Sequence, residues 1–201
     1  MEYGKNQEIS IRVAQPEDSD AIVQLQLISI KTLCAQDYSP EQLQALLHSK
    51  NRHRYWDENI FVAEIGQVIV GFAALQKYNY VITAMFVHPQ YIRRKIGTKL
   101  LRHIEQIARK KRVKKLLVYS SLTGQKFYIR NGFTPICQYN ILLQQRVVFP
   151  SVKMSKKLLV DKHAKKSKTK QIKNQVSKQE SKIYSKFKLF IFLVVMLCLI
   201  L

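Results

Sequence analysis

The sequence predicts an α/β domain, and three observations support this class. Short apolar runs with the alternation of strands occur between segments whose apolar residues recur at helical spacing. Turn or capping residues stand at the junctions, among them Gly66 and the pair Asn131-Gly132. The 201 residues are enough for one domain with its own core and an appendage.

The first half of the domain is predicted to form a strand, two helices and a hairpin. Pro16 with the acids after it is typical of a helix start, and Ser39 with Pro40 is a second one. Gly66 lies in the hairpin turn, and Gly71 indicates a bulge or a close backbone contact. The predicted strands are residues 9–13, 59–64 and 68–75. The predicted inner face of the first helix consists of Ala21, Ile22, Leu25, Ile28 and Ser29.

The second half is predicted to form a strand, a long helix, a strand, a short helix and two strands. The first of these strands ends before Pro89, which offers no ladder donor. Ser121 or Thr123 can cap the short helix, and Asn131-Gly132 can end it. The predicted strands are residues 80–87, 115–119, 133–139 and 147–154. The predicted core positions of the long helix are Ile96, Leu100, Leu101, Ile104, Ile107 and Ala108.

A basic turn precedes the long helix. A helix N-terminus presents unpaired N–H groups and about half a positive charge, so cations beside it are mildly unfavourable unless an anion is bound. The sequence therefore predicts an anion site, most naturally for a phosphate. A solvated basic helix face is the alternative. The residues of the predicted site are Arg93, Arg94, Lys95, Gly97 and Thr98.

The sequence around this turn resembles the acyl-CoA-binding motif of the GNAT N-acetyltransferase superfamily. Val-His-Pro-Gln-Tyr precedes it and Ile-Gly-Thr-Lys-Leu-Leu ends it. The family pattern is Arg/Gln-x-x-Gly-x-Gly/Ala. Its last glycine is present as Gly97, whereas Ile92 and Lys95 replace the leading Arg/Gln and the first glycine.

The order of the predicted elements is also the order of this family, so the resemblance extends from about Ile9 to Leu158. It implies the GNAT fold, with a mixed central sheet of about seven strands flanked by about four helices. In the family this sheet splays after the fourth strand, and the coenzyme enters there. The expected activity is the transfer of an acetyl group from acetyl-CoA to an unidentified amine.

The resemblance also implies which residues bind acetyl-CoA. The backbone of Phe86 and Val87 would pair with the pantetheine arm like an added strand, although both can also be core residues. If Lys95 is left-handed, it costs roughly 1–2 kcal/mol, which its ammonium can offset by meeting a phosphate. The implied coenzyme-binding residues are Phe86, Val87, Arg93, Arg94, Lys95, Ile96, Gly97 and Thr98.

The segment from Phe127 to Phe133 matches the family's Phe-Tyr-x-x-x-Gly-Phe. The resemblance implies that Tyr128 protonates the departing coenzyme A thiolate, a role that a phenol suits. The alternative is a core tyrosine. No general base is visible, because residues 79–87 contain no acid. Glu64 is the nearest candidate, but its preferred interpretation is a plain hairpin-turn residue. A water relay is a further alternative for the base.

Lysine and arginine outnumber acids by 34 to 13, which gives a net charge of +21. One concentration surrounds the basic turn, and the other follows Met154. A basic nucleic-acid binder is a less favoured alternative, because the tail has few aromatic residues for stacking and no known motif, and no specific nucleic-acid partner is expected. Three scattered cysteines favour neither a disulfide framework nor a zinc site, and no metal is expected. His53 and His88 are expected at the surface. A non-catalytic acyl-CoA-binding domain is a further alternative, motivated by Ile92, Lys95 and the missing base.

The chain is expected to have four parts: a frayed N-terminus (1–8), the acetyltransferase domain (9–158), a disordered lysine-rich linker (159–182) and a C-terminal membrane anchor (183–201). Residues 189–201 are uninterruptedly apolar. As a helix they would span about 20 Å of a core of about 30 Å, so the span is expected to begin at Ile183. The lysines before it predict a single pass with the domain in the cytoplasm. A core helix and an interfacial helix are the alternatives.

Overall fold

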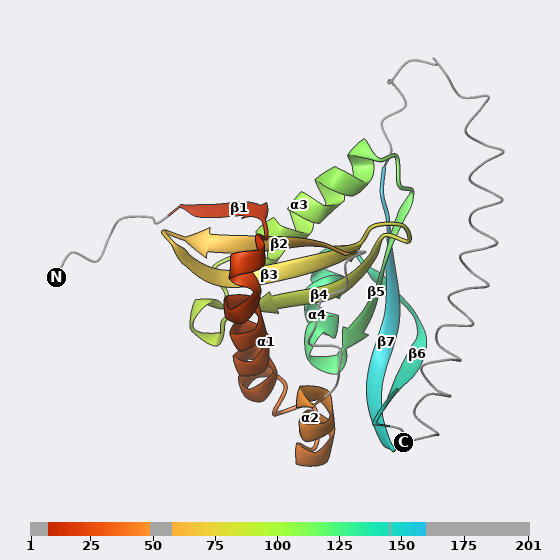
Figure 1. Ribbon diagram of the computed structural model, residues 1–201. Helices are drawn as coiled ribbons and strands as arrows, with labels where there is room; N and C mark the ends of the chain where they lie inside the picture. The colour runs from red at the N-terminus through yellow and green to blue at the C-terminus, as the bar shows by residue number, and fades with distance from the viewer. Residues whose placement is uncertain (1–7, 49–57, 145, 160–201) are drawn as a thin grey trace. The chain divides into compact units, whose positions relative to one another are not determined.

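A mixed seven-stranded sheet organises the domain (Figure 1). The strand order is β1-β2-β3-β4-β5-β7-β6, and all neighbours are antiparallel except β4 and β5, which run parallel. The computed structural model describes residues 8–48, 58–144 and 146–159. The predictions for the extreme N-terminus, for His53, for the linker beyond Leu159 and for the membrane anchor lie outside these residues.

The helices and strands follow the predicted order, and this confirms the predicted fold class. Strand β1 is extended as expected, and α1 is entered through a short 3-10 turn at Pro16–Asp18. The full set is β1 (Ile9–Val13), α1 (Ser19–Leu33), α2 (Pro40–Leu47), β2 (Glu58–Ile65), β3 (Val68–Gln76), β4 (Val81–Val87), α3 (Ile96–Lys110), β5 (Lys115–Ser121), α4 (Leu122–Arg130), β6 (Thr134–Leu143) and β7 (Val147–Lys157).

Local chemistry sets several of these boundaries. Ser39 caps α2 by accepting from the Gln42 N–H at 3.2 Å, and the Gln42 side chain accepts from the Ser39 N–H in return. At α4 the cap is Ser121, which accepts from the N–H of Gly124 at 3.1 Å. Gly66 in the hairpin turn and Gly132 after α4 have φ of 63° and 83°, the left-handed backbone that favours glycine.

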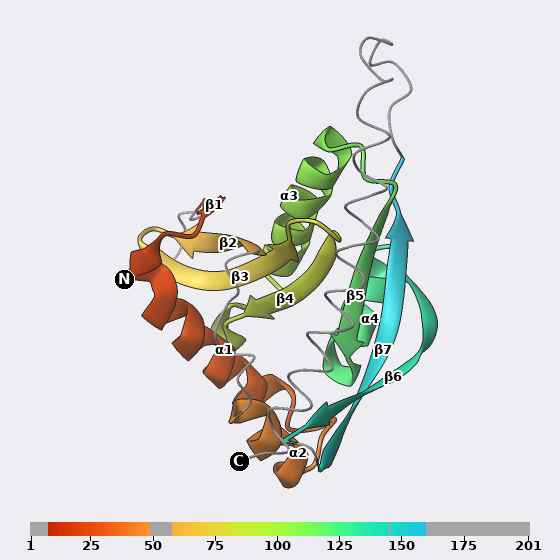
Figure 2. The same cartoon turned by 45° about the vertical axis from the view of Figure 1, so that its right-hand side comes forward.

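Helices cover both faces of the sheet (Figures 1 and 2). On one face α1 places Ile22 and Leu25 against Phe72 of β3. On the other, α3 and α4 share a larger core with β2, β3, β5 and β7. Leu100 of α3 is fully buried there, and truncating such a side chain to alanine costs roughly 2–5 kcal/mol.

The inner face of α1 differs from the one predicted. Ala21 and Ile28 are exposed, whereas Gln26 and Ile30 are buried. A helical stripe that contains Ile22 and Leu25 must continue at the next i+4 positions, whatever their polarity. The prediction was wrong because it followed hydrophobicity at Ala21 and Ile28 instead of the spacing.

Strands β4 and β5 separate after two residue pairs. Val81 opposes Leu117 and Ile82 opposes Val118, and beyond these no pairing joins the two strands in the described part of the chain. Strand β5 instead pairs with β7 along its whole length. The C-terminal ends of β4 and β5 therefore diverge, as Figure 2 shows, and we call this place the splay.

Within the described residues, no helix combines the length and the apolar character needed to cross a bilayer.

Candidate active site

The end of β4 directs backbone groups toward the splay. The N–H of His88 donates to the carbonyl of Val70 in β3 at 2.9 Å. Because peptide groups alternate along a strand, those of Phe86 face β3, whereas those of Met85 and Val87 face the β5 side. No described β5 residue pairs with them there. Met85 and Val87 can therefore pair with an extended ligand as they would with an added strand.

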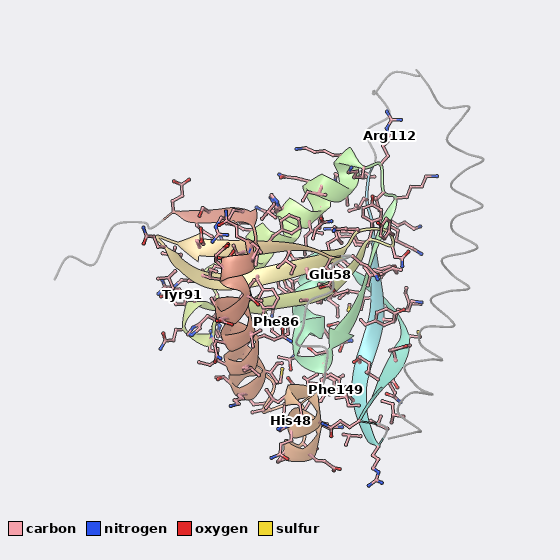
Figure 3. The ribbon with its side chains drawn as sticks, in the orientation of Figure 1. His48, Glu58, Phe86, Tyr91, Arg112 and Phe149 are labelled. Atoms are coloured by element: carbon pink, nitrogen blue, oxygen red, sulfur yellow. The ribbon has the colours of Figure 1, made fainter. Side chains whose placement is uncertain are left out.

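One of these backbone groups already has an internal partner. Ser29 of α1 is buried, and its Oγ donates to the carbonyl of Val87 at 3.0 Å. One turn earlier on the same stripe, the Oε1 atom of Gln26 is buried without a hydrogen-bond partner among the described residues. Phe86 contributes in another way, because its ring stacks on Phe72 with centroids 5.3 Å apart. The side chain of Phe86, which is labelled in Figure 3, thus belongs to the core between α1 and the sheet.

The basic turn follows a short 3-10 helix at Pro89–Tyr91. Arg93 and Lys95 both have left-handed backbone, with φ of 63° and 61°. Such a conformation costs a non-glycine residue roughly 1–2 kcal/mol. The guanidinium carbon of Arg94 lies 5.1 Å from the centre of the Tyr91 ring, which favours one orientation of this exposed side chain. All three cationic residues of the turn are exposed.

The first turn of α3 leaves its amides open. Lys95 occupies the capping position but its side chain makes no capping hydrogen bond. The N–H of Lys99 donates to the Lys95 carbonyl at 3.0 Å, so the amides of residues 96–98 precede the hydrogen-bond ladder of the helix. Thr98, half-buried, adds a hydroxyl to the same turn. Open amides beside three cations are the geometry of an anion site.

Gly97 is the residue where α3, β4 and α4 meet. A Cβ atom there would lie 3.2 Å from Cε2 of Phe127 and 3.7 Å from Cγ2 of Val87. Its neighbour Ile96 is 1% exposed and packs over Gly71, where a Cβ would lie 3.0 Å from Cγ2 of Ile96. The basic turn is therefore fixed to the end of β4 on one side and to α4 on the other.

Tyr128 lies in α4, directly after the residue that Gly97 contacts. Its ring meets those of Phe127 and Phe133 edge-on, each with centroids 5.2 Å apart. It is 5% exposed, and this burial raises the pKa of the phenol above its ordinary value. The phenol therefore stays protonated at physiological pH.

Glu64 is engaged away from the splay. The Arg12 guanidinium binds Glu64 Oε1 at 2.6 Å and Asp18 Oδ2 at 2.6 Å, and it joins β1, β2 and the turn before α1. The hydrogen bonds from Arg12 lower the pKa of the Asp18 carboxyl. Glu64 lies on β2, two strands from β4. Glu64 is thus a strand residue held by Arg12, and not a residue of the hairpin turn itself.

A carboxylate that the sequence did not single out lies at the start of α4. Thr123 donates from Oγ1 to Asp37 Oδ2 at 2.6 Å across 86 residues of sequence. Asp37 is exposed in the connection between α1 and α2, and its N–H donates to the Cys34 carbonyl at 3.0 Å. From residue 65 to residue 159 the sequence contains one acid, Glu105. Asp37 therefore brings a negative charge to the helix that carries Tyr128.

Tyr38, beside Asp37, joins three parts of the chain. Its hydroxyl donates to the Pro150 carbonyl at 2.8 Å and accepts from the Leu122 N–H, the first of α4, at 2.7 Å. Its ring stacks on Phe149 with centroids 4.1 Å apart. Burial raises the pKa of Tyr38 to about 12. The α1–α2 connection is thereby tied to α4 and β7, while Ser29 ties α1 to β4.

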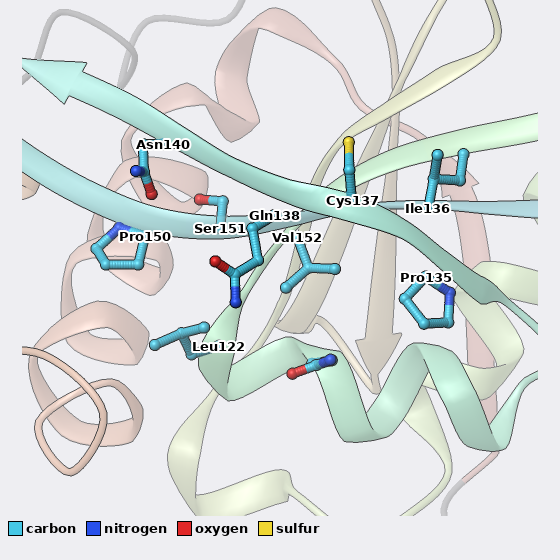
Figure 4. A pocket seen from close by; sticks show the side chains of 10 residues that line it. Leu122, Pro135, Ile136, Cys137, Gln138, Asn140, Pro150, Ser151 and Val152 are labelled. Atoms are coloured by element: carbon cyan, nitrogen blue, oxygen red, sulfur yellow. The ribbon is translucent and has the colours of Figure 1, made fainter.

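A surface hollow of about 510 Å³ lies on the other side of α4, between this helix and the β6–β7 hairpin (Figure 4). None of the predicted site residues lines it. Its described lining is mostly apolar or amide-bearing, with the hydroxyl of Ser151 and the thiol of Cys137 in addition. The lining residues are Leu122, Gln125, Pro135, Ile136, Cys137, Gln138, Asn140, Pro150, Ser151 and Val152.

The structure brings most of the predicted site residues to one region, around the end of β4, the start of α3 and α4. Val87, Gly97 and Phe127 are in mutual reach, and the basic turn and Tyr128 adjoin them. No group of three potential metal ligands lies together among residues 8–48, 58–144 and 146–159. His88, expected at the surface, is half-buried, and its Nδ1 accepts from the Gln90 N–H at 3.3 Å.

Comparisons with known proteins agree with this geometry. The family model described as "Acetyltransferase (GNAT) domain" matches residues 56–135. The uncharacterized N-acetyltransferase YafP of Escherichia coli K12 is 28% identical over 136 residues, which cover 66% of this chain and 86% of that protein.

Solved structures extend the similarity to the whole domain. The GCN5-related N-acetyltransferase of Rhodopseudomonas palustris is 27% identical, with a TM-score of 0.69 over 74% of this chain and 95% of that one. The PaiA N-acetyltransferase of Thermoplasma acidophilum, solved in complex with coenzyme A, is 24% identical, with a TM-score of 0.59 over 75% of this chain and 99% of that one. At this identity the second similarity concerns the fold alone.

Proposed function

Because this chain belongs to the GNAT acetyltransferase superfamily, we propose that it transfers an acetyl group from acetyl-CoA to the nitrogen of an amine. One observation carries the proposal. The open amides at the start of α3 and the cations of the basic turn adjoin the end of β4, with which no described β5 residue pairs, and Tyr128 follows Phe127, the residue that Gly97 contacts. An elongated ligand with a phosphate at one end and a thioester at the other suits this spatial order of basic turn, strand end and tyrosine.

The donor is held in two places. The pyrophosphate of acetyl-CoA binds the amides of residues 96–98, together with Arg93, Arg94 and Lys95. The pantetheine arm pairs with the outward backbone groups of Met85 and Val87. Since the Val87 carbonyl already accepts from Ser29, its free N–H is the group that the arm can use.

The reaction is a direct displacement. The neutral amine attacks the thioester carbonyl, a carbon–nitrogen bond forms, and the carbon–sulfur bond breaks with its electrons on sulfur. Tyr128 gives its proton to the thiolate, and the phenolate is reprotonated by the proton that the amine releases to solvent. Proximity supplies much of the rate, because the two reactants are held side by side.

Asp37 is the proposed contact for the acceptor. Its carboxylate lies at the start of α4, where Thr123 orients it. A carboxylate in this place attracts an ammonium group and can accept its proton before attack, directly or through water. We expect Asp37→Asn to raise the KM for the amine without changing the affinity for acetyl-CoA.

The membrane attachment is a separate part of the proposal. It rests on the apolar residues 189–201 and on the lysines before them. A chain truncated after Lys182 should appear in the soluble fraction, whereas the full chain should resist carbonate extraction. A full chain that is found wholly in the soluble fraction would remove this part.

Calorimetry with acetyl-CoA, followed by an acceptor screen over polyamines, amino acids and protein N-termini, tests the proposed activity. Binding with free coenzyme A released by at least one amine is the expected outcome. Binding without turnover would instead favour the non-catalytic acyl-CoA-binding domain, which Ile92 and the left-handed Lys95 motivate. The absence of binding at millimolar ligand would contradict both.

A further inference from the structure

Six cations gather where α3 ends and β5 begins, and we call them the basic corner. The backbone places them together: Lys115 and Lys157 are cross-strand partners, and the N–H of Leu158 donates to the Lys114 carbonyl at 2.8 Å. All six side chains are exposed. Figure 3 shows Arg112 past the end of α3, far from Tyr91 near the start of that helix. The six are Lys110, Lys111, Arg112, Lys114, Lys115 and Lys157.

Among residues 8–48, 58–144 and 146–159, no acid forms an ion pair with these six side chains. Glu105, the one acid between residues 65 and 159, is 5% exposed and already binds Arg109 at 2.9 Å and Lys156 at 2.6 Å. At the same end of the sheet Glu58 is buried on β2, three strands away from β5. The partial negative charge at the C-terminus of α3 favours Lys110 and Lys111 but falls off within the last turn.

The charges of the corner that lie beyond the last turn of α3 work against stability. Like charges directly opposite each other on neighbouring strands are destabilising, as for Lys115 and Lys157. The corner also lies at the opposite end of α3 from the proposed phosphate site, about 20 Å away along a 15-residue helix. Acetyl-CoA bound at the basic turn is too distant to neutralise it, so the corner is available to another anionic partner.

Two further features indicate the class of that partner. Leu159, two residues after Lys157, is 88% exposed, and the sequence continues through a lysine-rich stretch to the apolar residues 189–201. Tyr78, in the β3–β4 turn, is 62% exposed close to the start of β5, since the Leu117 N–H donates to the Tyr80 carbonyl. Cations rimmed by an exposed tyrosine and leucine are typical of a surface that contacts a bilayer interface.

We propose that the basic corner docks on the anionic phospholipid headgroups of a membrane. This inference draws on the proposed membrane attachment, and it is independent of acetyl transfer. Juxtamembrane lysines gain from an anionic leaflet only within a Debye length. The corner contains Lys157, and from there the sequence continues into the lysine-rich stretch and the apolar residues 189–201.

Lysine footprinting of the full chain tests the docking. The protein is mixed with vesicles of phosphatidylcholine, with or without phosphatidylserine, and labelled with an amine-reactive reagent, and the extent at each lysine is read by mass spectrometry. With phosphatidylserine, Lys111, Lys114, Lys115 and Lys157 should react about fivefold more slowly, the factor equivalent to about 1 kcal/mol per lysine near such a surface. The exposed Lys31 and Lys126 serve as internal controls and should not change.

Each part of the proposal has its own contradicting outcome. Equal labelling of corner and control lysines in both vesicles would overturn the docking. Corner protection by a single-stranded oligonucleotide but not by phosphatidylserine would assign the corner to nucleic acid instead. Protection by phosphatidylserine without retention on phosphatidylcholine would keep the docking and reject the apolar anchor. Acetyl-CoA calorimetry on the same preparation reports the enzyme separately.

Discussion

The two ends of α3 carry similar residues under opposite electrostatic conditions. A left-handed basic residue flanks each end, Lys95 with φ of 61° and Arg112 with φ of 58°. At the C-terminal end the N–H groups of Lys111, Arg112 and Val113 bond the last carbonyls of the helix. At the N-terminal end the first amides lie before the helical ladder, and the cations there oppose the helix dipole.

The comparison of the two ends shows which cations are stabilised by the helix itself and which are stabilised only by a bound anion. Cations in the last turn of a helix stabilise it, so Arg109 and Lys110 need no ligand to account for them. Cations at the N-terminus are unfavourable until an anion binds, and Gly97 fixes them against Phe127. The two ends can be separated by substitution, because changes at the N-terminal end should affect the coenzyme and changes at the C-terminal end should not.

The largest effect is expected at Tyr128, which follows Phe127, the residue that Gly97 contacts at the N-terminal end of α3. Tyr128→Phe should lower turnover by about 100-fold or more, the usual contribution of a general acid, because the hydroxyl acts only as the thiolate leaves. The acetyl-CoA affinity should stay nearly unchanged, since the ring remains packed. Single-turnover kinetics measure the first quantity and calorimetry the second. Unchanged turnover with chemistry rate-limiting would remove the acid role.

Gly97→Val should give the next largest effect. The new side chain would meet Phe127 and Val87, and overpacking of this kind costs roughly 1–3 kcal/mol. We expect the acetyl-CoA affinity to fall by about tenfold or more, because the amides of residues 96–98 move relative to β4. Lys110→Val, at the exposed other end, should leave the affinity unchanged. Thermal unfolding of both variants identifies any general loss of structure, and equal affinity losses would end the distinction between the two ends.

Arg94→Ala should weaken coenzyme binding by roughly tenfold, the loss of about one charge-assisted contact. An S-acetyl pantetheine, which lacks the pyrophosphate, should be affected much less. Lys111→Ala is the matched change at the C-terminal end and should alter neither ligand. If Arg94→Ala weakens both ligands to the same extent, the phosphate site does not include this residue.

The smallest effect concerns the two left-handed residues. Lys95→Gly and Arg112→Gly should each stabilise the protein by about 0.5–1 kcal/mol, since the relief of strain exceeds the entropy that glycine adds to the unfolded chain. Chemical denaturation measures this, and a loss of stability in either variant would contradict it. Only Lys95→Gly should change the acetyl-CoA affinity. A decrease means that the ammonium meets a phosphate, and an increase means that the residue obstructs the site.

Local sequence chemistry predicted the elements because each signal acts within a few residues. The Ser39 cap, the Gly66 turn and the Gly132 stop need only their immediate neighbours. The sequence around the basic turn likewise predicted open amides beside cations, a property of one turn of helix. The resemblance to a known family added the splay, which the pairing of only two residues between β4 and β5 confirms.

The rest depends on contacts between distant parts of the chain. Tyr38 bonds residues 84 and 112 positions away, and Lys156 reaches Glu105 across 51 positions. No local pattern distinguishes Tyr38 from the other tyrosines or Asp37 from a surface acid. Gln26 lies inside because the helical period requires it, against its own polarity. These residues became visible only when the fold had set their neighbours.

Strand β5 has a consequence for the reach of the enzyme. The strand starts at Lys115 in the basic corner and ends at Ser121, the cap of α4, so its seven residues span about 20 Å. If the basic corner rests on the headgroups, the thioester would lie about 20 Å above the membrane surface. Amines buried at lipid depth would then be out of range, whereas side chains or termini that project a similar distance from the bilayer, and solutes that diffuse along it, would be within range.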